Sequence, residues 1–188
     1  MHWICRNTAD FTEEALQQAY ACLSPTRKEH IDRLRKEEDR RRSLVAQLLV
    51  QQLLREHYDL SQAQLHRQDN GCPYLTGCDL YVSISHCDEM VACAVSDAPV
   101  GIDIERIRPT KYPLFHKVCT AQELAYVQPE GDGLCQDPDV LRRFFEIWTA
   151  KEAYFKKRGT GITDLKSVNV LPLPRQTYYM EDFVLQII

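Results

Sequence analysis

Hydrophobic residues recur at helical spacing most clearly over residues 38–57. Leucine and valine return there every three or four positions, the period at which side chains share one face of an α-helix. Two helices are predicted before this one, at about residues 12–23 and directly after Ser24 and Pro25, because serine caps free amides and proline suits a first turn. Two more are predicted at residues 120–127 and 137–157.

Short apolar runs predict the strands. They lie at residues 3–5, 80–84, 90–95, 100–105, 167–171 and 178–188. The runs at 80–84 and 90–95 are close enough to form a hairpin, and Asp69, Asn70 and Gly71 signal a turn before them. Residues 128–136 contain one proline, two glycines and acids, which favours a mobile loop.

The order of strand, helices and strands occurs twice along the chain. We therefore expect an α+β fold made of two similar lobes, residues 1–98 and 99–188, that together form one compact unit. The length of 188 residues and the hydrophobic content of 44% fit one sizeable core or two small ones.

Charge and cysteine content narrow the classes of function. Lys and Arg number 23 against 27 Asp and Glu, a net charge of −4, which disfavours a general nucleic-acid binder. The eight cysteines form no C-x-x-C pair, no signal peptide is recognisable, and no apolar run approaches the ~20 residues that span a bilayer. We expect a cytoplasmic protein with reduced thiols that does not insert into membranes.

Two carboxylates share one face of the strand predicted at residues 100–105. Alternation places Asp103 and Glu105 on one side of the strand and its branched apolar residues on the other. Magnesium in proteins commonly binds one or two carboxylates together with substrate phosphates, so this pair is a candidate metal site. A half-exposed strand with acidic residues facing outward explains the pattern equally well.

Glu152 lies within the apolar stripe of the helix predicted at residues 137–157. A buried carboxylate is costly unless a cation or hydrogen bonds compensate its charge. Lys156, one turn later, offers an ordinary ion pair along the helix. A metal ion shared with Asp103 and Glu105 is the other candidate partner.

Two further groups of polar residues suggest anion binding. Ser85 and His86 follow a predicted strand, and a basic and hydroxyl cluster lies near the starts of two helices, where backbone amides favour anions. This cluster includes Arg27, His30, Arg42 and Ser43. Structural serine and histidine residues and solvated charged helix faces remain the alternatives.

Four segments in order resemble motifs of the 4′-phosphopantetheinyl transferases. Residues 100–105 (VGIDIE) and 148–156 (WTAKEAYFK) are similar to the paired signature of this family, and residues 83–86 (SISH) and Gly71-x-Pro73 match two further motifs. The resemblance extends over about residues 24–171. It is closest to the surfactin-synthetase-activating type, a monomer of two α+β lobes related by a pseudo-twofold axis.

The resemblance implies a set of site residues. Asp103, Glu105 and Glu152 would bind Mg²⁺ beside the diphosphate of coenzyme A, and Lys156 would hold phosphate nearby with help from Lys151. The residues expected to contact the nucleotide and its phosphates are Arg27, His30, Arg42, Ser43, Ser85 and His86.

The implied reaction transfers 4′-phosphopantetheine from coenzyme A to a serine of an apo acyl or peptidyl carrier protein, with 3′,5′-ADP as leaving group. Asp103, Glu152 and Lys156 would be catalytic, and Glu152 is base, metal ligand or both. The carrier is expected to dock around a loop at residues 110–120. Two alternatives are a non-catalytic module that binds carrier proteins and another Mg²⁺-dependent phosphoryl or nucleotidyl transferase, although no P-loop or dinucleotide fingerprint is present.

The sequence departs from the family pattern at two places. Cys72 stands where several members have the lysine of a Gly-Lys-Pro motif, so one cation is absent from the expected coenzyme A site. The sequence also ends at Ile188, before the further strands usual in the family, which implies either that the second sheet lacks an edge or that the sequence is truncated.

Overall fold

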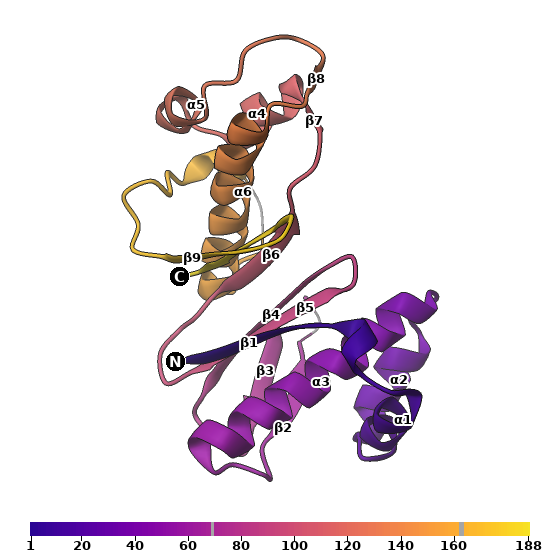
Figure 1. The fold of residues 1–188 in the computed structure, drawn as a ribbon. Coiled ribbons are helices and arrows are strands. Elements are labelled where there is room, and N and C mark those ends of the chain that lie inside the picture. The colour runs from indigo at the N-terminus through magenta and orange to yellow at the C-terminus, as the bar shows by residue number, and fades with distance from the viewer. Residues whose placement is uncertain (69, 162–163) are drawn as a thin grey trace. The chain divides into compact units, whose positions relative to one another are not determined.

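Two compact units, Met1–Val100 and Gly101–Ile188, make up the chain (Figure 1). The structure is a computed structural model and describes residues 1–68, 70–161 and 164–188. Each unit contains a three-stranded antiparallel sheet and one long helix packed on it. The expected α+β class with two similar lobes is thus confirmed.

The sheet of the first unit has the strand order β1-β5-β4. It is formed by β1 (His2–Asn7), β5 (Met90–Ser96) and β4 (Tyr81–Cys87), and the last two form the predicted hairpin. The residues of β5 from Val91 to Val95 have no exposed surface, as expected for a central strand. The predicted third helix is α3 (Glu37–Tyr58), whose apolar face packs on this sheet.

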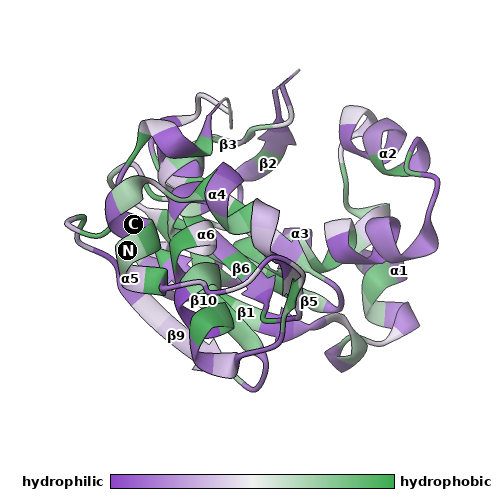
Figure 2. Ribbon diagram, turned by 90° about the horizontal axis from the view of Figure 1, so that it is seen from above, coloured by the Kyte–Doolittle hydropathy of each residue, from purple (hydrophilic) through white to green (hydrophobic). Residues whose placement is uncertain are grey.

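Two short helices precede α3 in the chain, as predicted. The Thr12 hydroxyl caps α1 (Glu13–Ala21), and the Ser24 hydroxyl caps α2 (Pro25–Asp32), which begins with proline. A 3-10 turn, η1 (Thr8–Asp10), links β1 to this region. Figure 2 shows that α2 is mostly hydrophilic, and Arg27 and Ile31 are its buried residues.

A second hairpin in the first unit was not predicted. It pairs β2 (Gln64–Arg67) with β3 (Pro73–Thr76), both short strands with few branched residues. Asn70 and Gly71 lie in its connection, where the amide of Gly71 donates to Gln68 O. Asp69, the first residue of the predicted turn, lies outside the described residues.

The sheet of the second unit has the strand order β6-β10-β9. It is formed by β6 (Ile102–Arg106), β10 (Phe183–Ile187) and β9 (Gln176–Met180). The long helix α6 (Pro138–Arg158) packs on β6 and β10; Asp137 caps its start and Gly159, in a left-handed conformation, ends it. The single strand expected over residues 178–188 is in fact the β9–β10 hairpin, because Glu181 adopts a left-handed turn conformation.

Shorter elements complete the second unit. Helix α4 (Tyr112–Val118) lies within the segment 110–120 expected as a loop, between β7 (Thr110–Lys111) and α5 (Ala121–Val127). Thr120 and Glu123 form a capping box at α5. The predicted loop 128–136 contains β8 (Leu134–Cys135), which pairs with β7.

The prediction of a strand at residues 167–171 is wrong. This segment follows the 3-10 turn η2 (Leu165–Ser167) and continues without regular structure. Its backbone groups bond to side chains instead of a neighbouring strand: Val168 O accepts from Lys151, and the amide of Val170 donates to Glu123. Among the described ranges, none of the helices has the length and apolar character that crossing a membrane requires.

Candidate functional site

Three carboxylates of the second unit converge. β6 presents Asp103 and Glu105 on one face, and α6 brings Glu152 to the same place. One oxygen of each carboxylate lies within 4.8 Å of the others. This is the set of acids expected from the sequence, and their hard oxygen ligands are of the kind that Mg²⁺ binds.

The burial of Asp103 separates the two explanations for the acidic strand. Asp103 is 1% exposed, so its carboxylate does not face solvent as it would on a half-exposed strand. Lys156 Nζ donates to Asp103 Oδ1 at 2.6 Å, which links α6 to β6. Lys156 therefore forms an ion pair between α6 and β6, and is not limited to an ion pair within its own helix.

Glu152 has an incompletely compensated charge. Burial, first, and the negative charges of Asp103 and Glu105 raise its pKa to about 7, against the opposing effect of the positive charge of Lys156. The three carboxylates lie together, with Lys156 paired to Asp103, and form an acidic site of the kind that a divalent cation would neutralise. The residues present therefore fit a magnesium ion.

Gly101 allows β6 and α6 to approach closely enough to form this site. A Cβ atom on Gly101 would lie 1.8 Å from the carbonyl oxygen of Ala153, the residue next to Glu152. No side chain fits there without moving the helix backbone. The glycine of the motif at residues 100–105 thus sets the distance between the strand and the helix that carry the carboxylates.

The first unit brings together part of the predicted phosphate-binding set. Arg27 on α2 is 4% exposed and donates through Nη2 to Ser43 Oγ on α3 at 2.8 Å. Arg27 lines a cavity in the first unit. His30, one turn after Arg27, and Arg67 line the same cavity. Burial is the main cause that lowers the pKa of Arg27, to about 10, and the charge of Arg67 contributes.

Arg42 lies in a different setting. Its Nη1 donates to Asp88 O in the turn between β4 and β5, and its Nη2 pairs with Asp39. Ser85 and His86 are on β4, which leads into that turn; Ser85 is buried and His86 is exposed. The structure thus anchors Arg42 to the hairpin that carries Ser85 and His86.

Comparison with known proteins assigns both units to one family. The model of the 4′-phosphopantetheinyl transferase superfamily matches residues 99–187, and that of the 4′-phosphopantetheinyl transferase N-terminal region matches residues 10–98. The chain belongs to the 4′-phosphopantetheinyl transferase superfamily. The matched regions contain all the residues of the carboxylate site and of the Arg27 cavity.

Individual members of the superfamily match over most of the chain. The 4′-phosphopantetheinyl transferase gsp of Aneurinibacillus migulanus is 32% identical over 66% of this chain and 51% of its own length. The 4′-phosphopantetheinyl transferase Sfp of Bacillus subtilis (strain 168) is 27% identical over 81% of this chain and 67% of its own length. The chain therefore spans about half to two thirds of the length of these relatives.

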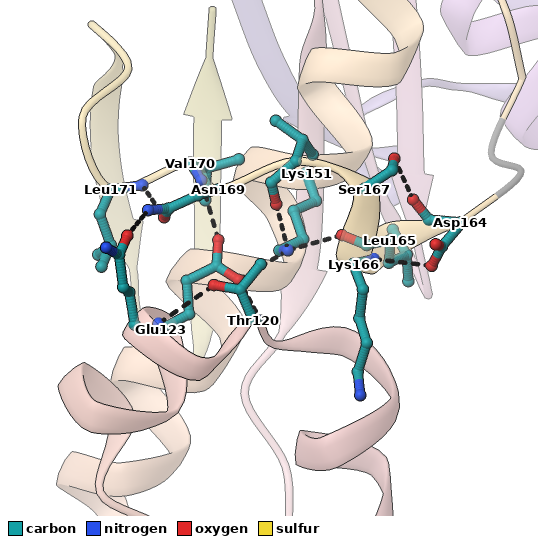
Figure 3. A network of polar contacts seen from close by, with 12 residues as sticks. Thr120, Glu123, Lys151, Asp164, Leu165, Lys166, Ser167, Asn169, Val170 and Leu171 are labelled. Carbon is teal, nitrogen blue, oxygen red and sulfur yellow. Dashed lines mark hydrogen bonds and ion pairs between the residues drawn. The ribbon is translucent and has the colours of Figure 1, made fainter.

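Lys151 of this superfamily member has contacts that differ from those expected. Its side chain is wholly buried, and Nζ contacts Glu123 Oε2 at 2.7 Å, Leu165 O at 2.6 Å and Val168 O at 2.7 Å (Figure 3). An ammonium group has three donors, and these partners use all of them. We therefore assign Lys151 to the core of the second unit, where it joins α6 to α5 and η2, and not to cofactor binding.

Sequence reasoning missed Gln186, which faces Asp103 across the sheet. The two residues are opposite each other in the β6–β10 register, and Gln186 is wholly buried. Thr177 donates its hydroxyl to Gln186 Oε1 at 2.9 Å, so a polar row crosses all three strands beside the carboxylates. A glutamine between leucine and isoleucine in an apolar strand was the available signal.

Proposed function

We propose that this chain transfers the 4′-phosphopantetheine group of coenzyme A to a serine of an apo acyl or peptidyl carrier protein. Membership of the superfamily supports the reaction class. The observation that carries the proposal is the convergence of Asp103, Glu105 and Glu152 within 4.8 Å. A protein that only docked carriers would have no need for this charged cluster.

The three carboxylates would hold Mg²⁺. When bound, the ion supplies Lewis-acid stabilisation of the negative charge on the diphosphate of coenzyme A. The strand β6 and the helix α6 fix the ligands from two sides, with Gly101 setting their separation. Lys156 restrains Asp103 from the helix, and Gln186 lies opposite Asp103 on the neighbouring strand.

The residues around the reacting groups have complementary roles. The serine oxygen forms a bond to the β-phosphorus, the bond from that phosphorus to the bridging oxygen breaks, and 3′,5′-ADP leaves with that oxygen. Glu152 accepts the serine proton, a role suited to a group whose pKa is raised to about 7. Lys156 has three donors, one of which binds Asp103, and its others donate to phosphate oxygens.

The phosphate-binding residues of the first unit belong to the same proposal. Arg27 and Ser43 are already joined by a hydrogen bond, and His30 lines the same cavity as Arg27. These three residues, together with Arg42, Ser85 and His86, would bind the nucleotide part and the phosphates of coenzyme A. Guanidinium and hydroxyl groups are suited to phosphate oxygens.

The direct test incubates the chain with coenzyme A, Mg²⁺ and a panel of apo carrier proteins, and weighs the carriers by mass spectrometry. The expected result is a mass gain of one phosphopantetheine on the carrier serine. A gain equal to a nucleotide would favour the other transferase class. No gain on any competent carrier would favour the binding module.

Variants of the acids connect the reaction to the site. Glu105→Gln and Glu152→Gln should each lower the transfer rate by at least about 100-fold, since each removes a charge that acts on the reacting groups. Glu146→Gln is the matched control, because Glu146 lies on the same helix α6 but bonds to Tyr126 and Tyr179. Turnover by Glu105→Gln at the rate of the control would remove Glu105 from the site.

A further inference from the structure

A cavity of about 350 Å³ in the first unit lies between α2 and the β2–β3 hairpin. The charged side chains around it are mostly positive: Arg27 comes from α2, Arg33 from the C-cap of that helix, and Arg67 from the end of β2. Glu29, the single acid among the described residues of its lining, already pairs with Arg33 at 2.5 Å. The cavity therefore has an excess of positive charge.

Two of these arginines have buried N–H groups without an acceptor among the described residues. Arg27 uses Nη2 for Ser43, while its Nε and Nη1 are buried and unpaired. Arg67 donates Nη1 to Gly71 O at 2.7 Å, while its Nε is buried and unpaired. Buried, unpaired donors on charged groups cost free energy that a bound anion would offset.

The two guanidinium groups also act on each other and on His30. Burial lowers the pKa of Arg67, and it lowers the pKa of His30 with further contributions from Arg27, Arg67 and Arg33. Positive groups are thus held together with insufficient negative charge between them. An anion with a double charge would satisfy both arginines at once.

Arg67 is fixed beside the segment where the sequence lacks a cation. Its bond to Gly71 O holds it next to Cys72, which stands in place of the lysine of a Gly-Lys-Pro motif. The connection is itself ordered, since the amide of Gln68 donates to Cys72 O and that of Cys72 to Asn70 Oδ1. An arginine five residues before Cys72 is therefore available to replace the missing charge.

We propose that Arg67 and Arg27 together bind a phosphate monoester dianion in this cavity, and that Arg67 supplies the positive charge that Cys72 does not. Planar guanidinium groups bind phosphate through paired, charge-assisted hydrogen bonds. Tyr74 and His66, whose rings stack at 5.4 Å, form an aromatic wall of the same cavity that suits a nucleotide. That the phosphate belongs to coenzyme A rests on the function proposed above.

Calorimetric titration with 3′,5′-ADP in EDTA, with adenosine as the uncharged probe, tests the proposal without metal or turnover. Arg67→Gln should weaken binding of 3′,5′-ADP at least about 10-fold, the usual scale for a charge-assisted hydrogen bond to phosphate, and leave adenosine binding unchanged. Arg33→Gln is the matched control: Arg33 lines the same cavity but is paired with Glu29 and mostly exposed, so its loss should change affinity less than about 3-fold.

A second variant separates a charge effect from a structural one. Cys72→Lys in the Arg67→Gln background restores a cation but not the bond to Gly71 O, and should recover most of the lost affinity. Recovery supports the proposal. Wild-type affinity in Arg67→Gln, or a loss that Cys72→Lys does not repair in a double variant of normal thermal stability, overturns it.

The same variants distinguish this inference from the proposed transfer activity. If the rate of transfer to a carrier at limiting coenzyme A is the same for Arg67→Gln as for the wild type, the inference is contradicted and the proposed function still stands. Arg67-dependent binding of 3′,5′-ADP without transfer to any carrier contradicts the proposed function, and the anion site stands.

Discussion

Glu152 is the residue with the clearest conflict of charge in the second unit. It is largely buried beside Asp103 and Glu105, whose negative charges raise its pKa, while the positive charge of Lys156 opposes them. Such a group destabilises the folded chain when it is ionised without a cation. Its placement is therefore a cost to folding that a bound metal ion would remove.

Stability without metal should depend on pH through Glu152. Its pKa in the folded chain, about 7, lies above the ordinary value of 4.5, so between these values the folded state binds more protons than the unfolded state. The free energy of unfolding then decreases as pH rises from 4.5 to 7. In EDTA, Glu152→Gln should lose this decrease and melt at a higher temperature than the wild type at pH 8.

Thermal melts of the two proteins at several pH values measure this difference. Adding Mg²⁺ at pH 8 should raise the melting temperature of the wild type and have little effect on the variant, since a ligand stabilises only the state that binds it. If the melting temperatures of the two proteins changed with pH in parallel, ionisation of Glu152 would not be the cause of the loss of stability.

At the scale of elements, β6 and α6 form the site because they pack with almost no space between them. The amide of Gly101 donates to Ile188 O, and Gly101 O accepts from the amide of Ile188. Gly101 also faces the α6 backbone at Ala153. The strand and helix that carry the acids are thus held by main-chain contacts as well as by side chains.

Gly101→Ala should separate these elements. The added Cβ would meet Ala153 O, so we expect a loss of about 2 kcal/mol or more in stability and loss of the thermal shift with Mg²⁺. Gly133→Ala is the control, because a Cβ there meets nothing within 4 Å. An unchanged melting temperature and Mg²⁺ response in Gly101→Ala would contradict the assigned role of this contact.

The buried Lys151–Glu123 pair joins α6 to α5 and should be important for stability. Lys151→Met leaves the Glu123 carboxylate buried without its cation, which typically costs about 3–5 kcal/mol. Adding Glu123→Gln should recover part of that loss by removing the stranded charge. Chemical denaturation measures both variants; a double variant less stable than Lys151→Met would show that the capping role of Glu123 exceeds the cost of its charge.

Some elements could be predicted from sequence because their signals are local. The leucine period of α3, the cap of α2 and the hairpin of β4 and β5 follow from residues close in the chain. The segment at 167–171 was mistaken for a strand because valine favours strands. Its backbone is instead bound by Lys151 and Glu123, which are distant in sequence.

At the scale of the whole molecule, the predicted plan of two α+β lobes is confirmed, and the acids of the second lobe meet as expected. Alternation along β6 indicated which carboxylates share a face. The role of Lys151 and the presence of Gln186 and Arg67 in polar clusters were not accessible in this way, because they depend on contacts between strands, helices and turns far apart in the chain.

A crystal grown with coenzyme A and Mn²⁺, which binds carboxylate oxygens much as Mg²⁺ does and scatters anomalously, tests the central claim most directly. We predict one anomalous peak coordinated by Asp103, Glu105 and Glu152. With coenzyme A bound, carboxylates that point apart and no metal among them would contradict the assignment of this site.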